Sequence, residues 1–204
     1  MIKAQEHLDE LLAINIEDEL PLDIKMIIHY SKALVLKMGS RMIDKAKAQE
    51  ILQKLVTEDT TLFDLRYHVI LDLVELLLHE FKTYGETVVQ EQIISLIDQL
   101  NETADKSNSI DLLIKAMIIK SKFLLVDGQI KEAEDLLEKA KTKSKATDSI
   151  SIKNWVNFEI ETLHREFEKL INLIDQNKPV KERIENLQLV EYISKATRYF
   201  QKIG

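Results

Sequence analysis

The residues best suited to chemistry in this chain are Glu161 and His164, which stand three positions apart on a predicted helix. A Glu-x-x-His sequence can supply ligands to a di-iron centre, but that centre needs the motif on two helices and an inward glutamate on two more. No other histidine has a glutamate three residues before it: His7, His29, His68 and His79 all lack one. We therefore interpret Glu161, His164 and Glu168 as a surface ion cluster.

Other catalytic and cofactor motifs are also missing from the sequence. The chain has no cysteine, which removes disulfides, thiolate catalysis and cysteine-based zinc sites. It has no glycine-rich phosphate loop and no His-Glu-x-x-His motif, and its single tryptophan gives no aromatic platform for stacking bases. We predict that the protein is not an enzyme and uses no cofactor or metal.

A second group of residues could bind without reacting. Lys25 and Lys32 lie seven residues apart on one face of a predicted helix, and Lys115 and Lys122 repeat this spacing in a later helix. A lysine contact to a carboxylate is charge-assisted and about twice as strong as a neutral hydrogen bond. The alternative is that these lysines only solvate the surface. The predicted partner-binding residues are Lys25, Lys32, Lys115, Lys122, Lys153 and Asn157.

The elements that would position these residues are helices. Four glycines and two prolines in 204 residues leave few turns for β-hairpins, while helix-forming residues dominate. Gly39 offers a left-handed turn that would end a helix. We predict an all-α fold in one helical-repeat domain, residues 1–204, which begins with an unpaired helix 3–14. Antiparallel hairpins are expected to follow at residues 22–57, 62–104, 110–145 and 150–201.

The chain also repeats itself. The sequence Lys-Ala-Gln-Glu at residues 3–6 returns at 47–50, and leucines follow both copies at the same offsets. Residues 117–145 carry small side chains at the positions where two helices would cross, together with a turn glycine, and a helix pair can approach closely only where such side chains are small. The small residues are Ser121, Ala133 and Ala140, the turn glycine is Gly128, and the large residues of the pattern are Leu124 and Leu137.

In this register, residues 117–145 resemble a tetratricopeptide repeat (TPR). The resemblance implies a right-handed superhelix of stacked hairpins that binds a peptide or partner protein on its concave face, at positions that include the lysines named above. The expected partner has an acidic segment or a free C-terminus. The family's tryptophan and proline positions are Met117 and Lys145 here, and the hairpins are longer, so the chain would be a divergent relative.

The partners and location follow from charge and hydropathy. The net charge is -7, and residues 61–110 contain three Lys or Arg against nine Asp or Glu, which argues against nucleic acid as a partner. The acidic residues, Asp72 and Glu75 among them, are interpreted as a solubilising surface or as a docking face for a basic partner. The most apolar run, residues 69–78, is too short and too charged to span a membrane. We expect a cytoplasmic protein.

Three further interpretations concern the ends and the aromatic residues. The unpaired helix 3–14 would expose an apolar face, so either the chain is part of a longer protein or a partner, such as a second copy, covers that face. A different function class is a sensory or regulatory domain of a larger signalling or transcription-regulating protein. Trp155 and Phe158 are expected to lie in the core.

Overall fold

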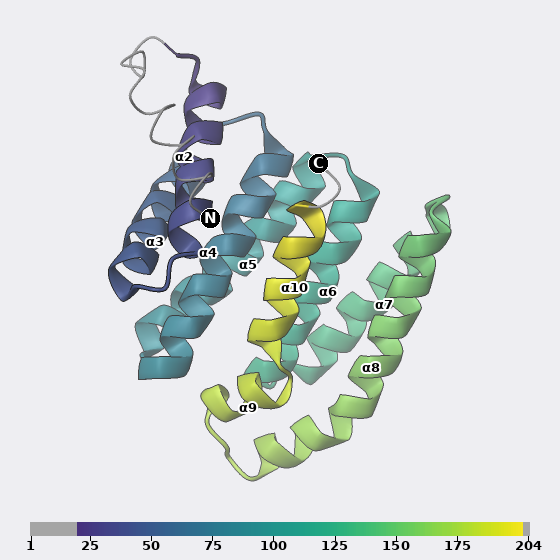
Figure 1. The fold of residues 1–204 in the computed structure, drawn as a ribbon. Helices are drawn as coiled ribbons and strands as arrows, with labels where there is room; N and C mark the ends of the chain where they lie inside the picture. The colour runs from purple at the N-terminus through teal and green to yellow at the C-terminus, as the bar shows by residue number, and fades with distance from the viewer. Residues whose placement is uncertain (1–19, 202–204) are drawn as a thin grey trace.

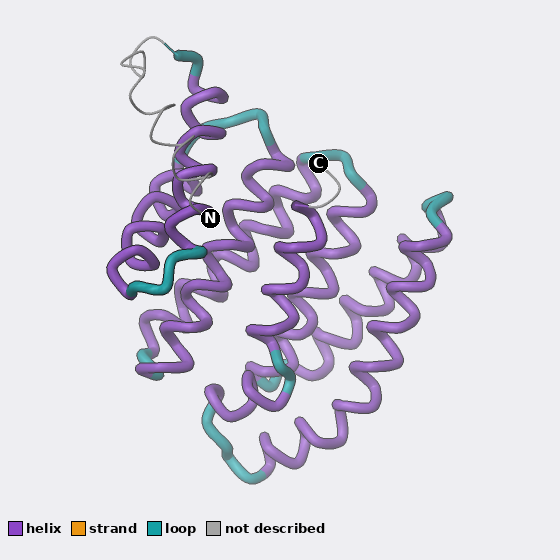
Figure 2. The backbone as a smooth tube through the Cα atoms, in the orientation of Figure 1, coloured by secondary structure: helices purple, strands orange, loops and turns teal. Residues whose placement is uncertain are grey.

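The computed structural model describes residues 20–201, which form helices and no strand (Figure 1). The all-α prediction is therefore confirmed for this part of the chain. The loops between the helices are short (Figure 2). The helices are α2 (Leu22–Lys37), α3 (Met42–Thr57), α4 (Phe63–Tyr84), α5 (Thr87–Lys106), α6 (Ile110–Asp127), α7 (Ile130–Ala146), α8 (Ile150–Asp175), α9 (Val180–Asn186) and α10 (Leu189–Gln201).

Local signals explain where several of these helices begin and end. The Ser109 side chain caps α6 by accepting a hydrogen bond from the backbone N–H of Leu112 at 3.4 Å, and Ser149 caps α8 in the same way. Gly85 and Gly128 end α4 and α6 at φ values of 73° and 86°, a left-handed conformation that costs a glycine little.

Gly39 does not adopt the left-handed conformation that we expected, because only Gly85 and Gly128 have positive φ among the described glycines. A Cβ atom at Gly39 would lie 2.9 Å from a carboxylate oxygen of Asp44 and 2.9 Å from the carbonyl oxygen of Leu36. A glycine therefore suits this position because α3 begins so close to the end of α2.

Helices α2 to α8 form a row in which each helix packs against the next along the chain (Figure 1). The pairs α2–α3, α4–α5 and α6–α7 correspond to the first three expected hairpins. Ala48, Ala133 and Ser121 are fully buried, as expected of small residues at helix crossings. Ser31 follows Lys25 at the same distance as Ser121 follows Lys115, but it is exposed. The predicted helix 3–14, and the dimer contact assigned to it, lie outside the described residues.

The last hairpin differs from the prediction. Its second helix is broken at Gln188, where φ is 47°, into the short α9 and the longer α10. Helix α10 then packs mainly against α4, far from it in sequence, and not alongside α8 (Figure 1). Its buried apolar side chains are those of Leu189, Val190 and Ile193. The periodicity of residues 180–201 predicted that one face is buried, but not which neighbour covers it.

Two of the acidic residues that we assigned to the surface are buried in α4. Asp72 and Glu75 are 1 % and 6 % exposed, and the Lys37 ammonium donates to both carboxylates. The Tyr30 hydroxyl also donates to Asp72, at 2.6 Å. Buried charges are normally paired, so these carboxylates hold α2 against α4 and do not serve as a solubilising surface.

Within residues 20–201, no helix is both long enough and apolar enough to cross a membrane.

Candidate binding cavity

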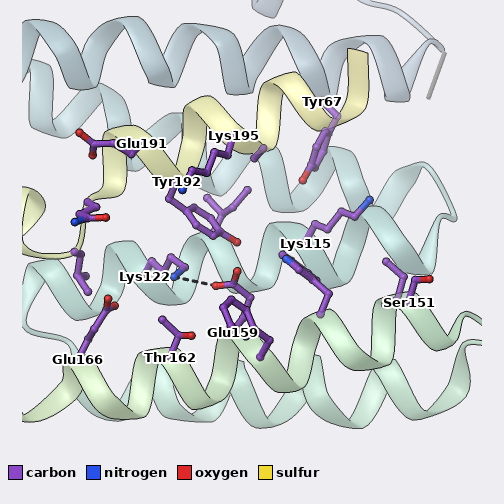
Figure 3. Close-up of a pocket in the computed structure, with 17 residues that line it drawn as sticks. Tyr67, Lys115, Lys122, Ser151, Glu159, Thr162, Glu166, Glu191, Tyr192 and Lys195 are labelled. Carbon is purple, nitrogen blue, oxygen red and sulfur yellow. Dashed lines mark ion pairs between the residues drawn. The ribbon is translucent and has the colours of Figure 1, made fainter. Parts of the chain in front are cut away.

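A cavity of about 580 Å³ opens between α6, α8 and α10, with Tyr67 of α4 at its edge (Figure 3). Its volume falls within the range of small-molecule sites. The larger apolar side chains that line it are Ile119, Ile152, Trp155, Phe158, Leu187 and Tyr192. The charged ones are Lys115, Lys122, Glu159, Glu166, Glu191 and Lys195.

One wall of the cavity contains a buried ion pair. The Lys122 ammonium lies 3.0 Å from a carboxylate oxygen of Glu159, and the two side chains are only 4 % and 8 % exposed. The same ammonium lies 4.2 Å from the centre of the Tyr192 ring. Lys122 of α6 therefore joins a carboxylate of α8 to an aromatic face of α10, and the two charges cancel within the wall (Figure 3).

Glu166 of α8 is a further carboxylate of the cavity, and unlike the buried Glu159 it is half-buried. It forms no ion pair with any other residue that the structure describes. Burial raises the pKa of its carboxyl group above the ordinary value, and the nearby Lys122 charge opposes that shift. Burial therefore makes the ionised form of Glu166 less well solvated than in water, and a positive charge in contact with it would stabilise that form.

Lys115 lies toward the opposite end of the cavity from Glu166, close to Ser151 (Figure 3). Burial lowers the pKa of the Lys115 ammonium, while Asp111, one helical turn earlier, acts in the opposite direction. Lys115 and Glu166 thus have opposite charges, and Tyr192 lies between them (Figure 3).

The structure brings together only two of the predicted partner-binding residues. Lys115 and Lys122 both line the cavity, but Lys122 is 3 % exposed and cannot contact a partner while α10 covers it. The partner contact that we predicted for Lys122 would therefore require α10 to move away, and it remains a prediction. Lys153 is half-buried and Asn157 exposed on α8, and neither lines the cavity. On α2, Lys25 and Lys32 are half-buried and also lie away from it.

Sequence reasoning missed Glu159, Glu166 and Tyr192. The seven-residue spacing of the two glutamates was visible in the sequence, but their partner on α6 was not. We predicted Phe158 as a core residue, and this was wrong: the residue is 58 % exposed and lines the cavity. Trp155 packs partly against the core and also lines the cavity.

The Glu-x-x-His motif does not contribute to the cavity. Glu161, His164 and Glu168 are all exposed on α8 and do not line it. Among residues 20–201, no three His, Cys, Asp or Glu side chains are grouped so that they could hold a metal ion. The cavity offers charged and apolar side chains as contacts for a ligand.

No family model, curated protein or solved structure significantly matches the chain. The resemblance to a TPR therefore depends on the residues of α6 and α7 alone.

Proposed function

We propose that the protein is a non-catalytic interaction module, a divergent TPR-like right-handed superhelix that binds a segment of a partner protein on its concave face. In this proposal α2, α4, α6 and α8 form the concave face. The observation that carries it is the position of α10, an amphipathic helix that lies on α4 (Figure 1). A face that accepts one amphipathic helix of the chain offers the same apolar contacts to a helix of a partner.

The contacts of α10 indicate which kind of segment would bind. Leu189 and Ile193, four residues apart, are both fully buried, so they form one apolar stripe. Complete burial of a side chain such as Ile193 stabilises the contact by about 1.5–3 kcal/mol. Lys25 and Lys32 on α2 remain the proposed contacts for an acidic segment or a terminal carboxylate of the partner. A partner helix would compete with α10 for α4.

A peptide with the sequence of residues 187–201 tests this proposal against the full chain. In the Ile193→Asp variant, a buried carboxylate should release α10 from α4, and the labelled peptide should then bind at least about tenfold tighter than to the unmodified chain. Fluorescence anisotropy measures the affinity, and circular dichroism checks that the helices persist. Glu185→Gln, at an exposed position of α9, is the matched control.

Two results would count against a helix-accepting face. The first is equal affinity of the peptide for the unmodified and the Ile193→Asp chains. The second is equal binding of a peptide that itself carries Ile193→Asp, since such a peptide lacks the central apolar side chain of the stripe.

The cavity favours a second candidate, a sensory or regulatory domain of a larger protein. Leu187 lies just before α10 and Tyr192 within it, and both form part of the cavity lining. A small ligand in the cavity would therefore touch the helix that covers α4 and could change its position. A DNA-binding, kinase or GTPase module in the same reading frame would support this candidate, whereas further helical hairpins would support the interaction module.

A further inference from the structure

Glu159 and Glu166 occupy equivalent positions two turns apart on α8. Seven residues correspond to almost two complete helical turns, so both side chains lie on the side of α8 that faces the cavity (Figure 3). Glu159 has a cationic partner, the ammonium of Lys122 at 3.0 Å. Glu166 has no such partner among the described residues. The cavity therefore contains two carboxylates on the same face of α8, of which only Glu159 is paired with a lysine of the described chain.

We propose that this cavity is a binding site for an organic amine with an apolar or aromatic body, whose ammonium group pairs with Glu166 as Lys122 pairs with Glu159. The ligand body would lie against Trp155, Phe158 and Tyr192. This proposal goes beyond the interaction function, because the site forms while α10 lies on α4 and does not require a partner protein.

The charges of the cavity select a cation over an anion. The ion pair of Lys122 and Glu159 is neutral as a unit and buried, so it attracts neither sign strongly. Lys115 at the far end already has the carboxylate of Asp111 nearby. Glu191 and Lys195 are exposed on α10, where water screens their charges. Glu166 is left as the half-buried carboxylate that an incoming cation would stabilise.

Protonation of Glu166 gives independent support. Burial raises the pKa of this carboxyl group and the Glu159 charge adds to the rise, while the positive charges of Lys122, Lys169 and Arg165 act against it. The pKa remains above its ordinary value, which means that the ionised form is less well solvated than in water. An ammonium in contact with it would favour the ionised form. Amine binding should therefore weaken as the pH falls through the pKa of Glu166.

The aromatic side chains account for the apolar body of the ligand. Phe158 lines the cavity and is 58 % exposed, so an apolar ligand there would remove part of its surface from water. Ser151 and Glu166, which both line the cavity, are fifteen positions apart on α8, and at the helical rise of 1.5 Å per residue the cavity extends over roughly 22 Å. A small aromatic amine would therefore occupy only the end of the cavity that contains Glu166.

Three probes with one phenethyl body test the choice of charge: phenethylamine, hydrocinnamate and phenethyl alcohol. Trp155 is the only tryptophan of the chain and lines the cavity, so its fluorescence reports on binding. With the unmodified full chain, we expect phenethylamine to bind at least about tenfold tighter than either other probe, because its contact to Glu166 is charge-assisted.

Matched variants on α8 assign the effect to one carboxylate. Glu166→Gln should abolish the preference for phenethylamine, while Glu168→Gln, at an exposed position two residues on, should leave it unchanged. A purely structural role of Glu166 would shift the melting temperature and leave the order of the three probes as it was. That result would overturn the proposal, as would preference for hydrocinnamate, equal affinity for all three probes, or no saturable binding of phenethylamine.

Discussion

Replacing Lys122 by methionine should lower the free energy of unfolding by about 3–5 kcal/mol, because it leaves the Glu159 carboxylate buried without its cation. Only 4 % of the Lys122 side chain and 8 % of the Glu159 side chain are exposed, so water cannot replace the lost contact. The contact of Lys122 with the Tyr192 ring would be lost as well. Methionine keeps most of the apolar stem of lysine, which limits the loss of packing.

The chain contains a matched control for this experiment. Lys54 and Glu50 also form an ion pair at 3.0 Å, but their side chains are 72 % and 66 % exposed. Lys54→Met should therefore cost only about 0.3–0.5 kcal/mol, as for other exposed pairs within a helix. The two substitutions change the same chemical group at the same distance, so the difference between them measures burial.

Urea unfolding followed by circular dichroism gives the free energies, and Trp155 fluorescence reports the same transition near the pair. The double variant Lys122→Met/Glu159→Leu should recover most of the loss, because neither charge then remains buried alone. A cost below about 1 kcal/mol for Lys122→Met would refute the reasoning, since that value is typical of pairs in contact with water. It would mean that α10 does not cover this pair in solution.

Two further predictions concern packing and protonation. Ala133→Leu should destabilise the fold by about 1–3 kcal/mol, because Ala133 is fully buried where α7 packs on α6, while Glu134→Leu at the exposed neighbouring position should stay within about 0.5 kcal/mol; thermal unfolding of both variants checks this. Burial lowers the pKa of His68 in the folded protein, so as the pH falls His68 is protonated in the unfolded chain before it is protonated in the folded one. The free energy of unfolding should therefore decrease as the pH falls below 6.5, the ordinary pKa of histidine. In urea unfolding at several pH values, His68→Gln should reduce this dependence, and an unchanged pH dependence would show that other groups cause it.

The helices could be predicted from the sequence because their signals are local. The segment predicted as the hairpin 62–104 forms α4 and α5, which span residues 63–106, and the segment 110–145 forms α6 and α7, which span residues 110–146. Gly85 and Gly128 end their helices in the left-handed conformation, whereas Gly39, for which we expected it, does not adopt it. Each of these features depends on residues within a turn or two of one another, so the sequence alone contains the necessary information.

The cavity could not be predicted, because it depends on contacts between residues far apart in the chain. Lys122 and Glu159 are 37 positions apart, and an isolated lysine or glutamate on a helix is usually exposed. The prediction that Asp72 and Glu75 lie on the surface was wrong for the same reason, because their shared partner, Lys37, lies on another helix. A pattern of charges shows which residues could pair, but only the packing of the helices decides which pairs are buried.

The directions of the apolar faces explain why a cavity forms next to α10. Helix α4 has buried side chains around most of its circumference, so it can accept a further helix after α3 and α5 have packed on it. Helix α8 lines the cavity with the apolar Trp155 and Phe158 toward one end and with Thr162 and Glu166 toward the other, so its apolar stripe does not continue along the cavity. Helix α10 therefore buries its own stripe on α4. A space is left beside α8, and the polar side chains of α8 that line it would recognise a ligand.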